Sequence, residues 1–174
     1  MRIRPLQPED HDAVGELTVE AYAHVDPATV ETGYDEELRD VAARSDGVEI
    51  LVAVDGDGDG PGESILGAVT YVPGPDSPGA EFTDADAAGI RMLAVAMDAR
   101  RRGVGEALTM ACVERARATD RRQIVLHSTD RMTAAHRLYL RLGFVCDPSL
   151  DWEGEPGLWL RGFRLRLDEA PGTA

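Results

Sequence analysis

One almost unbroken apolar segment restricts the fold of this chain more than any other feature. Residues 90–97 (IRMLAVAM) contain a single charged side chain and show no polar face. A strand of this kind is typical of the interior of a sheet that is covered on both faces. Segments on either side of it must therefore supply the helices that cover the sheet.

The remaining sequence predicts strands and helices in mixed order. Residues 48–55 and 64–72 are rich in β-branched side chains and are joined by a Gly/Asp loop, so we expect a hairpin. Residues 73–89 contain turn formers and acids and predict a loop. Together the patterns indicate an α/β fold with a mixed sheet and helices on both faces. The other predicted strands are 1–6, 123–128, 144–145 and 158–167. One predicted helix begins at Pro8, and three others cover 34–44, 103–119 and 132–142.

Length and composition exclude several classes of protein. A chain of 174 residues corresponds to one domain, which we place at residues 1–167, followed by a loose tail at 168–174. The net charge of −14 argues against nucleic acid and anionic membranes as partners, and no apolar run is long enough to span a membrane. Two cysteines suit a reducing compartment, so we expect a cytoplasmic protein. The four histidines are scattered, so no metal site is expected.

The acidity of the chain has more than one explanation. All 18 basic residues are arginine, and the sequence contains neither Lys nor Asn. Such a composition is consistent with mutational bias in the source or with adaptation to salt. It is also consistent with an acidic site entrance that attracts a cationic substrate. The absence of lysine excludes any mechanism that needs a Schiff-base lysine.

A second informative segment follows the apolar strand directly. Residues 100–102 are three consecutive arginines, and Gly103 and Gly105 then open a helix. The first amides of a helix have no intrahelical acceptor, and the positive end of the helix dipole lies there. Glycines let a ligand approach the backbone closely. The segment therefore predicts an anion-binding site. A solvent-exposed arginine turn that binds no ligand is the alternative interpretation of the same sequence.

At these residues the chain resembles the GNAT superfamily of acyl-CoA-dependent N-acyltransferases. Residues 100–105 (RRRGVG) fit the family's [QR]-x-x-G-x-[GA] pyrophosphate loop. Residues 135–144 (AHRLYLRLGF) look like its A-x-x-L-Y-x-x-x-G-F block. The predicted order of strands and helices is also similar to that of the family. The resemblance implies a mostly antiparallel central sheet whose two middle strands are splayed.

The resemblance also implies how acetyl-CoA would bind as a co-substrate. The pantetheine arm would lie between strands 90–97 and 123–128 and bond to the main chain near Leu93, Ala94 and Val95. A main-chain N–H, that of Leu93, would hold the oxyanion. The diphosphate would lie on the backbone of the anion-binding segment, which comprises Arg100, Arg101, Arg102, Gly103, Val104, Gly105, Glu106 and Ala107.

Tyr139 matches the family position that protonates the departing thiolate of coenzyme A. A phenol is protonated at neutral pH and can serve as an acid for a thiolate. However, Tyr139 shares a helical face with Ala135, Leu138 and Leu142, so a core tyrosine is the alternative.

Two positions depart from the family's pattern. Met132 replaces an Asn that often contacts the cofactor arm, and residues 89–91 (GIR) lack the Glu that often relays the proton of the amine. The sequence leaves the general base unassigned. Its candidates are Glu81, Asp84, Asp86, His127 and Asp130.

We therefore expect an enzyme that moves an acetyl group from acetyl-CoA directly to a primary amine, with a small molecule as the preferred acceptor. Two alternatives remain open: acetylation of a protein N-terminus or lysine, and a non-catalytic module that binds acyl-CoA. The apolar segment 158–167 would allow a homodimer.

Overall fold

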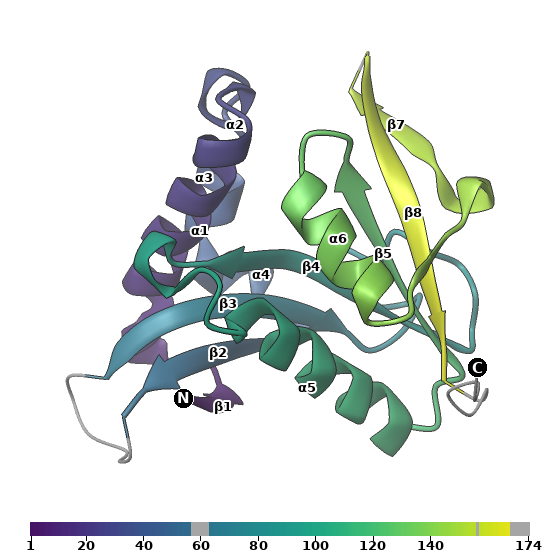
Figure 1. Ribbon diagram of the computed structural model, residues 1–174, viewed down its shortest axis with the longest axis horizontal. Coiled ribbons are helices and arrows are strands. Elements are labelled where there is room, and N and C mark those ends of the chain that lie inside the picture. Colours follow the sequence, from purple (N-terminus) through teal and green to yellow (C-terminus); the bar gives the residue numbers. More distant parts are fainter. Residues whose placement is uncertain (57–62, 156, 168–174) are drawn as a thin grey trace.

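The computed structural model describes residues 1–56, 63–155 and 157–167. Within these residues the chain forms one eight-stranded sheet in the order β1-β2-β3-β4-β5-β8-β6, and β7 pairs with β8 (Figure 1). Only β4 and β5 pair in parallel in the described part. The strands are β1 (Arg2–Pro5), β2 (Glu49–Asp55), β3 (Ser64–Val72), β4 (Ala87–Val95), β5 (Gln123–Thr129), β6 (Val145–Cys146), β7 (Trp152–Glu155) and β8 (Leu158–Arg166).

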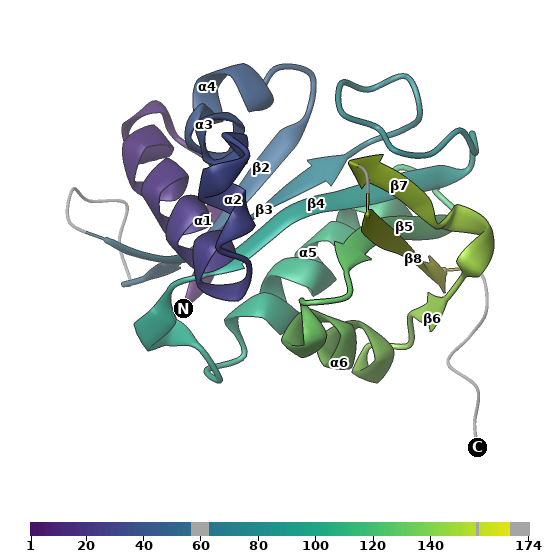
Figure 2. The same cartoon turned by 90° about the horizontal axis from the view of Figure 1, so that it is seen from above.

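Helices cover both faces of the sheet, as the sequence predicts. Figure 2 shows α1 to α4 on one side and α5 and α6 on the other. The α-helices are α1 (His11–Val25), α2 (Ala28–Glu31), α3 (Tyr34–Arg39), α4 (Val41–Arg44), α5 (Val104–Ala118) and α6 (Thr133–Arg141). Short 3-10 turns lie at Pro8–Asp10, Met97–Ala99 and Pro148–Leu150. The expected mixed, mostly antiparallel α/β architecture is confirmed.

Each helical layer has its own core against the sheet. On the side of α5 and α6, Leu108 and Phe144 pack with strand residues such as Leu51 and Ile124, all of them fully or almost fully buried. On the other side, Val14 of α1 belongs to a cluster with residues of β2 and β3. Because the sheet is buried on both faces, β4 can be apolar along its length.

Several predicted boundaries were wrong for local reasons. The helix predicted over 34–44 is divided at Asp40, whose backbone is not helical and whose carboxylate accepts the Ala43 N–H at 3.0 Å. Strand β4 begins at Ala87, inside the predicted loop, and ends at Val95. Helix α2 and strand β7 were not predicted, because each has only four residues and shows no periodicity. The predicted tail at 168–174 lies outside the described residues.

No helix in the described part of the chain is both long and apolar enough to cross a membrane. Within the same residues, no three His, Cys, Asp or Glu side chains are grouped in a way that could hold a metal ion.

Candidate active site

The two middle strands of the sheet separate after a short paired stretch. β4 and β5 pair only from Ala87↔Gln123 to Ile90↔Leu126, although β4 continues to Val95 and β5 to Thr129. In Figure 1 the two strands diverge beyond this stretch. From residue 91 onward, no described strand pairs with the edge of β4 that faces β5. The expected splay is confirmed, and it leaves backbone N–H and C=O groups open to an extended ligand.

A β-bulge lies where the strands separate. β3 and β4 pair at Ala68↔Ala94 and again at Thr70↔Arg91, so two residues of β4, Met92 and Leu93, stand opposite one residue of β3. Met92 has a φ of +52°, a left-handed conformation that a bulky side chain rarely adopts. A bulge redirects the backbone of the strand that carries it. Here it changes the direction of the main chain at Leu93, the residue predicted to hold the oxyanion.

The predicted anion-binding segment lies at the open end of β4. Gly103 has a φ of +80° and forms the N-cap of α5, and the first intrahelical bond runs from Ala107 N–H to the Gly103 carbonyl at 3.0 Å. The amides of residues 104–106 therefore have no intrahelical acceptor. A Cβ added at Gly105 would lie 3.2 Å from Leu138 Cδ2 and 3.6 Å from Val95 Cγ2. The start of α5 thus lies against both α6 and β4.

The three arginines of this segment are not equivalent. Arg102 Nη2 lies 2.9 Å from Asp55 Oδ2, and this hydrogen bond lowers the pKa of the Asp55 carboxyl. Arg101 is exposed and Arg100 is partly buried, and neither makes an ion pair within the described residues. Glu106 lies beside Arg141, with 3.0 Å between the Arg141 Nη2 and Glu106 Oε2 atoms, so its side chain is already paired. Arg100 and Arg101 are therefore the cations available to an anion.

Tyr139 of α6 is 5% exposed and lies in the core. The centroid of its ring is 5.7 Å from the centroids of both the Phe144 and the Phe163 ring. Burial raises the pKa of the phenol well above its ordinary value, and nearby Cys112 adds a smaller effect. The phenol is therefore protonated at neutral pH, as an acid must be. The same surroundings also suit a core tyrosine.

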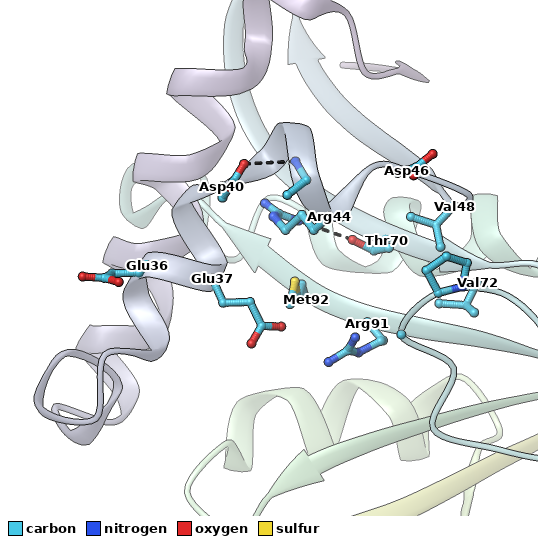
Figure 3. A pocket seen from close by; sticks show the side chains of 13 residues that line it. Glu36, Glu37, Asp40, Arg44, Asp46, Val48, Thr70, Val72, Arg91 and Met92 are labelled. Atoms are coloured by element: carbon cyan, nitrogen blue, oxygen red, sulfur yellow. Dashed lines mark hydrogen bonds between the residues drawn. The ribbon is translucent and has the colours of Figure 1, made fainter.

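A cavity of about 530 Å³ adjoins the splay. Its walls include aromatic side chains from three segments (Tyr22, Tyr34 and Trp152) and the β4 residues at the point of separation. A second cavity of about 490 Å³ shares Glu37, Arg91 and Met92 with it. Figure 3 shows this second cavity, in which Arg44 bonds to Thr70 and Glu37 points toward Arg91. The sequence does not reveal these cavities, because their walls come from segments that are far apart along the chain.

The structure separates the five candidates for the general base. Of these five, Glu81 and His127 line the first cavity, and they lie 3.1 Å apart at Oε2 and Nδ1. Asp84 accepts a hydrogen bond from Gln123, and Asp130 forms an ion pair with Arg161 at 2.8 Å. Asp86 is exposed and does not line either cavity.

Gly89 allows the loop before β4 to pack closely against that strand. A Cβ added at Gly89 would lie 2.6 Å from Cε1 of Phe82, a distance that real contacts do not allow. The missing side chain thus lets the ring of Phe82, the chain neighbour of Glu81, pack against β4. From the sequence alone, Gly89 is notable only as one of the positions that lack the family's Glu. The available signal for this contact was Phe82, an aromatic residue inside an acidic, turn-rich loop.

A sequence model of the Acetyltransferase (GNAT) family matches residues 14–144. No curated protein matches the sequence.

Solved structures resemble nearly the whole chain. A GCN5-related N-acetyltransferase from Kribbella flavida is 27% identical, with a TM-score of 0.66, and the match covers 95% of this chain and 97% of that one. A GNAT-family acetyltransferase from Staphylococcus aureus is 14% identical with a TM-score of 0.73, covering 95% and 98%. The protein yncA from Salmonella typhimurium, solved with its cofactor acetyl-CoA, is 23% identical with a TM-score of 0.64, covering 100% and 99%.

The contact between Gly89 and Phe82 gives a stability prediction. Gly89→Ala should destabilise the protein by about 1–3 kcal/mol, the usual cost of overpacking. In a Phe82→Ala background the same change should cost much less, because the clashing ring is gone. Urea unfolding of the four proteins measures both costs. Gly74→Ala in the same loop is the control, since its Cβ would meet only the tip of Arg121. Strictly additive costs would contradict the assigned contact.

Proposed function

This chain belongs to the GNAT family of acetyltransferases, and from that premise we propose that it transfers the acetyl group of acetyl-CoA directly to the amine of a small molecule. The observation that carries the proposal is the end of β4–β5 pairing at Ile90 and Leu126, beside the start of α5. An unpaired strand edge and a set of free helix amides together suit a ligand that is extended at one end and anionic at the other.

Acetyl-CoA has this form. Its pantetheine arm would add to β4 along Leu93, Ala94 and Val95, and its diphosphate would lie on the backbone of residues 100–107. Arg100 and Arg101 would add charge, while Glu106 would contribute only its amide, because its carboxylate is paired with Arg141. The yncA structure, which contains acetyl-CoA on a similar fold, supports this assignment.

The chemistry is a direct transfer. The lone pair of the amine forms a C–N bond with the thioester carbon, and the C–S bond then breaks so that its electrons leave with sulfur. The Leu93 N–H, at the bulge, would stabilise the oxyanion that forms in between. Tyr139 would give its proton to the thiolate, which yields the free thiol of coenzyme A.

The acceptor would occupy the cavity beside the splay. A volume of about 530 Å³ suits a small molecule, and the aromatic walls offer contacts to an apolar body that carries the amine. The β7–β8 hairpin contributes Trp152, Leu158 and Leu160 to the wall opposite α1. These walls favour a compact acceptor over an extended polypeptide.

The anion-binding segment can be tested by charge reversal. Arg100→Glu should raise the dissociation constant of acetyl-CoA by about tenfold or more, because it replaces an attraction to the diphosphate with a repulsion. The kcat at saturating acetyl-CoA should change little. Arg117→Glu, the same change at the exposed far end of α5, is the control and should leave binding unchanged. Isothermal titration calorimetry measures both variants, and equal affinities in all proteins would refute the assigned site.

The role of Tyr139 predicts a loss of rate without a loss of fold. Tyr139→Phe keeps the ring between Phe144 and Phe163 and removes only the hydroxyl. We expect kcat to fall by about 10²–10⁴-fold, as for a lost general acid. Steady-state release of the coenzyme A thiol measures the rate, and thermal unfolding checks the fold. A variant as active as the wild type would show that Tyr139 is only a core residue.

A further inference from the structure

A carboxylate from the loop before β4 reaches the cavity in which the acceptor is proposed to bind. Glu81 Oε1 lies 3.0 Å from Arg91 Nη2, and its Oε2 lies 3.1 Å from His127 Nδ1. All three residues line the cavity next to Ile90 and Met92, where the middle strands separate. Each carboxylate oxygen has only one of these partners, so each retains capacity to accept a further hydrogen bond.

The hydrogen bonds of His127 define where a proton can lie. Nε2 is 2.9 Å from the Leu150 carbonyl oxygen, which can only accept, so Nε2 carries a hydrogen. Nδ1 faces Glu81 Oε2. A single proton fits between these two atoms, and without it two lone pairs face one another. The pair is thus arranged to take up one proton.

The ring of His127 is fixed and shielded from water. Its side chain is 3% exposed, and the edge of Trp152 packs against it with ring centroids 6.2 Å apart and planes at 82°. Because both nitrogens already have partners, His127 offers no lone pair to a substrate. Glu81, with a side chain that is 22% exposed, is the member of the pair that a bound amine can touch.

We propose that Glu81 and His127 together form the proton acceptor of the acetyl transfer. The proposal rests on the function proposed above. Glu81 is the catalytic residue, because it touches the amine, and His127 is a positioning residue that also stores the proton. Imidazole is the side chain best suited to store a proton near neutral pH. The pair thus supplies, from a loop and from β5, the base that residues 89–91 of β4 lack.

The proton count of the step balances. As the neutral amine forms its C–N bond, its nitrogen becomes cationic and passes one proton to a Glu81 oxygen. This same proton then lies between Glu81 Oε2 and His127 Nδ1 and completes the hydrogen bond there. The thiolate takes a different proton from Tyr139. Exchange with solvent then returns one proton to Tyr139 and removes one from the pair, and the products are the amide and the free thiol.

The side chains around the pair explain its geometry. Arg91 holds Glu81 from β4 and packs against the same loop, since a Cβ added at Gly79 would lie 2.5 Å from Arg91 Nη1. Phe82, resting on Gly89, fixes the adjacent backbone. The other titratable groups that line the cavity are Tyr22, Asp26, Tyr34, Glu37 and Arg131. The ion pair with Arg91 thus holds the Glu81 carboxylate beside His127.

Two variants separate proton transfer from simple packing. Glu81→Gln removes the basic oxygen, and His127→Asn places an amide N–H near the position of Nδ1. His127→Asn can therefore still hold Glu81, but it cannot store a proton. Asp76→Asn, which removes an exposed acid from the same loop, is the matched control. The assay is release of coenzyme A thiol from acetyl-CoA with a panel of primary amines, led by 2-phenylethylamine and its less basic β,β-difluoro analogue.

We expect Glu81→Gln to lower kcat by about 10²–10⁴-fold at pH 7 while acetyl-CoA binds as in the wild type by calorimetry. The loss should be smaller for the difluoro amine, whose nitrogen gives up its proton more readily. His127→Asn should also lose rate, and its pH–rate profile should differ in shape from that of the wild type, because the amide cannot hold the transferred proton. Asp76→Asn should match the wild type.

The proposal is overturned if Glu81→Gln is as fast as the wild type, or if His127→Asn keeps both the rate and the pH profile. An equal loss with both amines would also overturn it, because it would indicate a role in packing. Failure of the proposed function looks different: the wild type itself would then release no thiol with any amine of the panel.

Discussion

The end of pairing between β4 and β5 is the constraint on which the rest of this molecule depends. A sheet normally satisfies the polar groups of its backbone between neighbouring strands, and here that rule holds only as far as Ile90 and Leu126. Beyond this point the edge of β4 needs another partner. The bulge at Met92 and Leu93, the free amides of α5 and the aromatic cavity all lie at this opening. In the function proposed above, the pantetheine arm of acetyl-CoA would be this partner.

The site is assembled from segments whose charges are balanced in pairs. Arg91 lies beside Glu81, Arg102 beside Asp55, and Arg131 beside Asp26. Arg100 and Arg101 have no ion-pair partner in the described residues. They therefore form a locally positive segment in a chain whose net charge is −14. The same balance leaves Glu37, at the junction of the two cavities, as a carboxylate without an ion pair in the described residues.

Those parts of the fold and site that depend on local patterns could be predicted from the sequence. The apolar run before residue 97 and the glycines at 103 and 105 each determine their own backbone, so strand β4 and the start of α5 were predicted to within a few residues. The break at Asp40 depends on a single side chain, whose carboxylate caps the next helix. The contact of Phe82 with Gly89 and the hydrogen bond of Glu81 to His127 join residues 7 and 46 positions apart. Such contacts follow from tertiary packing, which the hydrophobic periodicity of the sequence does not predict.

Amide hydrogen exchange with and without acetyl-CoA tests the central claim most directly. If the ligand replaces the missing strand, added acetyl-CoA should slow exchange at the amides of β4 beyond Ile90 and at residues 101–106, while β1 and β2 remain unchanged. Exchange that is unaltered at β4, or slowed only at distant surfaces, would contradict the claim that the separated strands form the binding site.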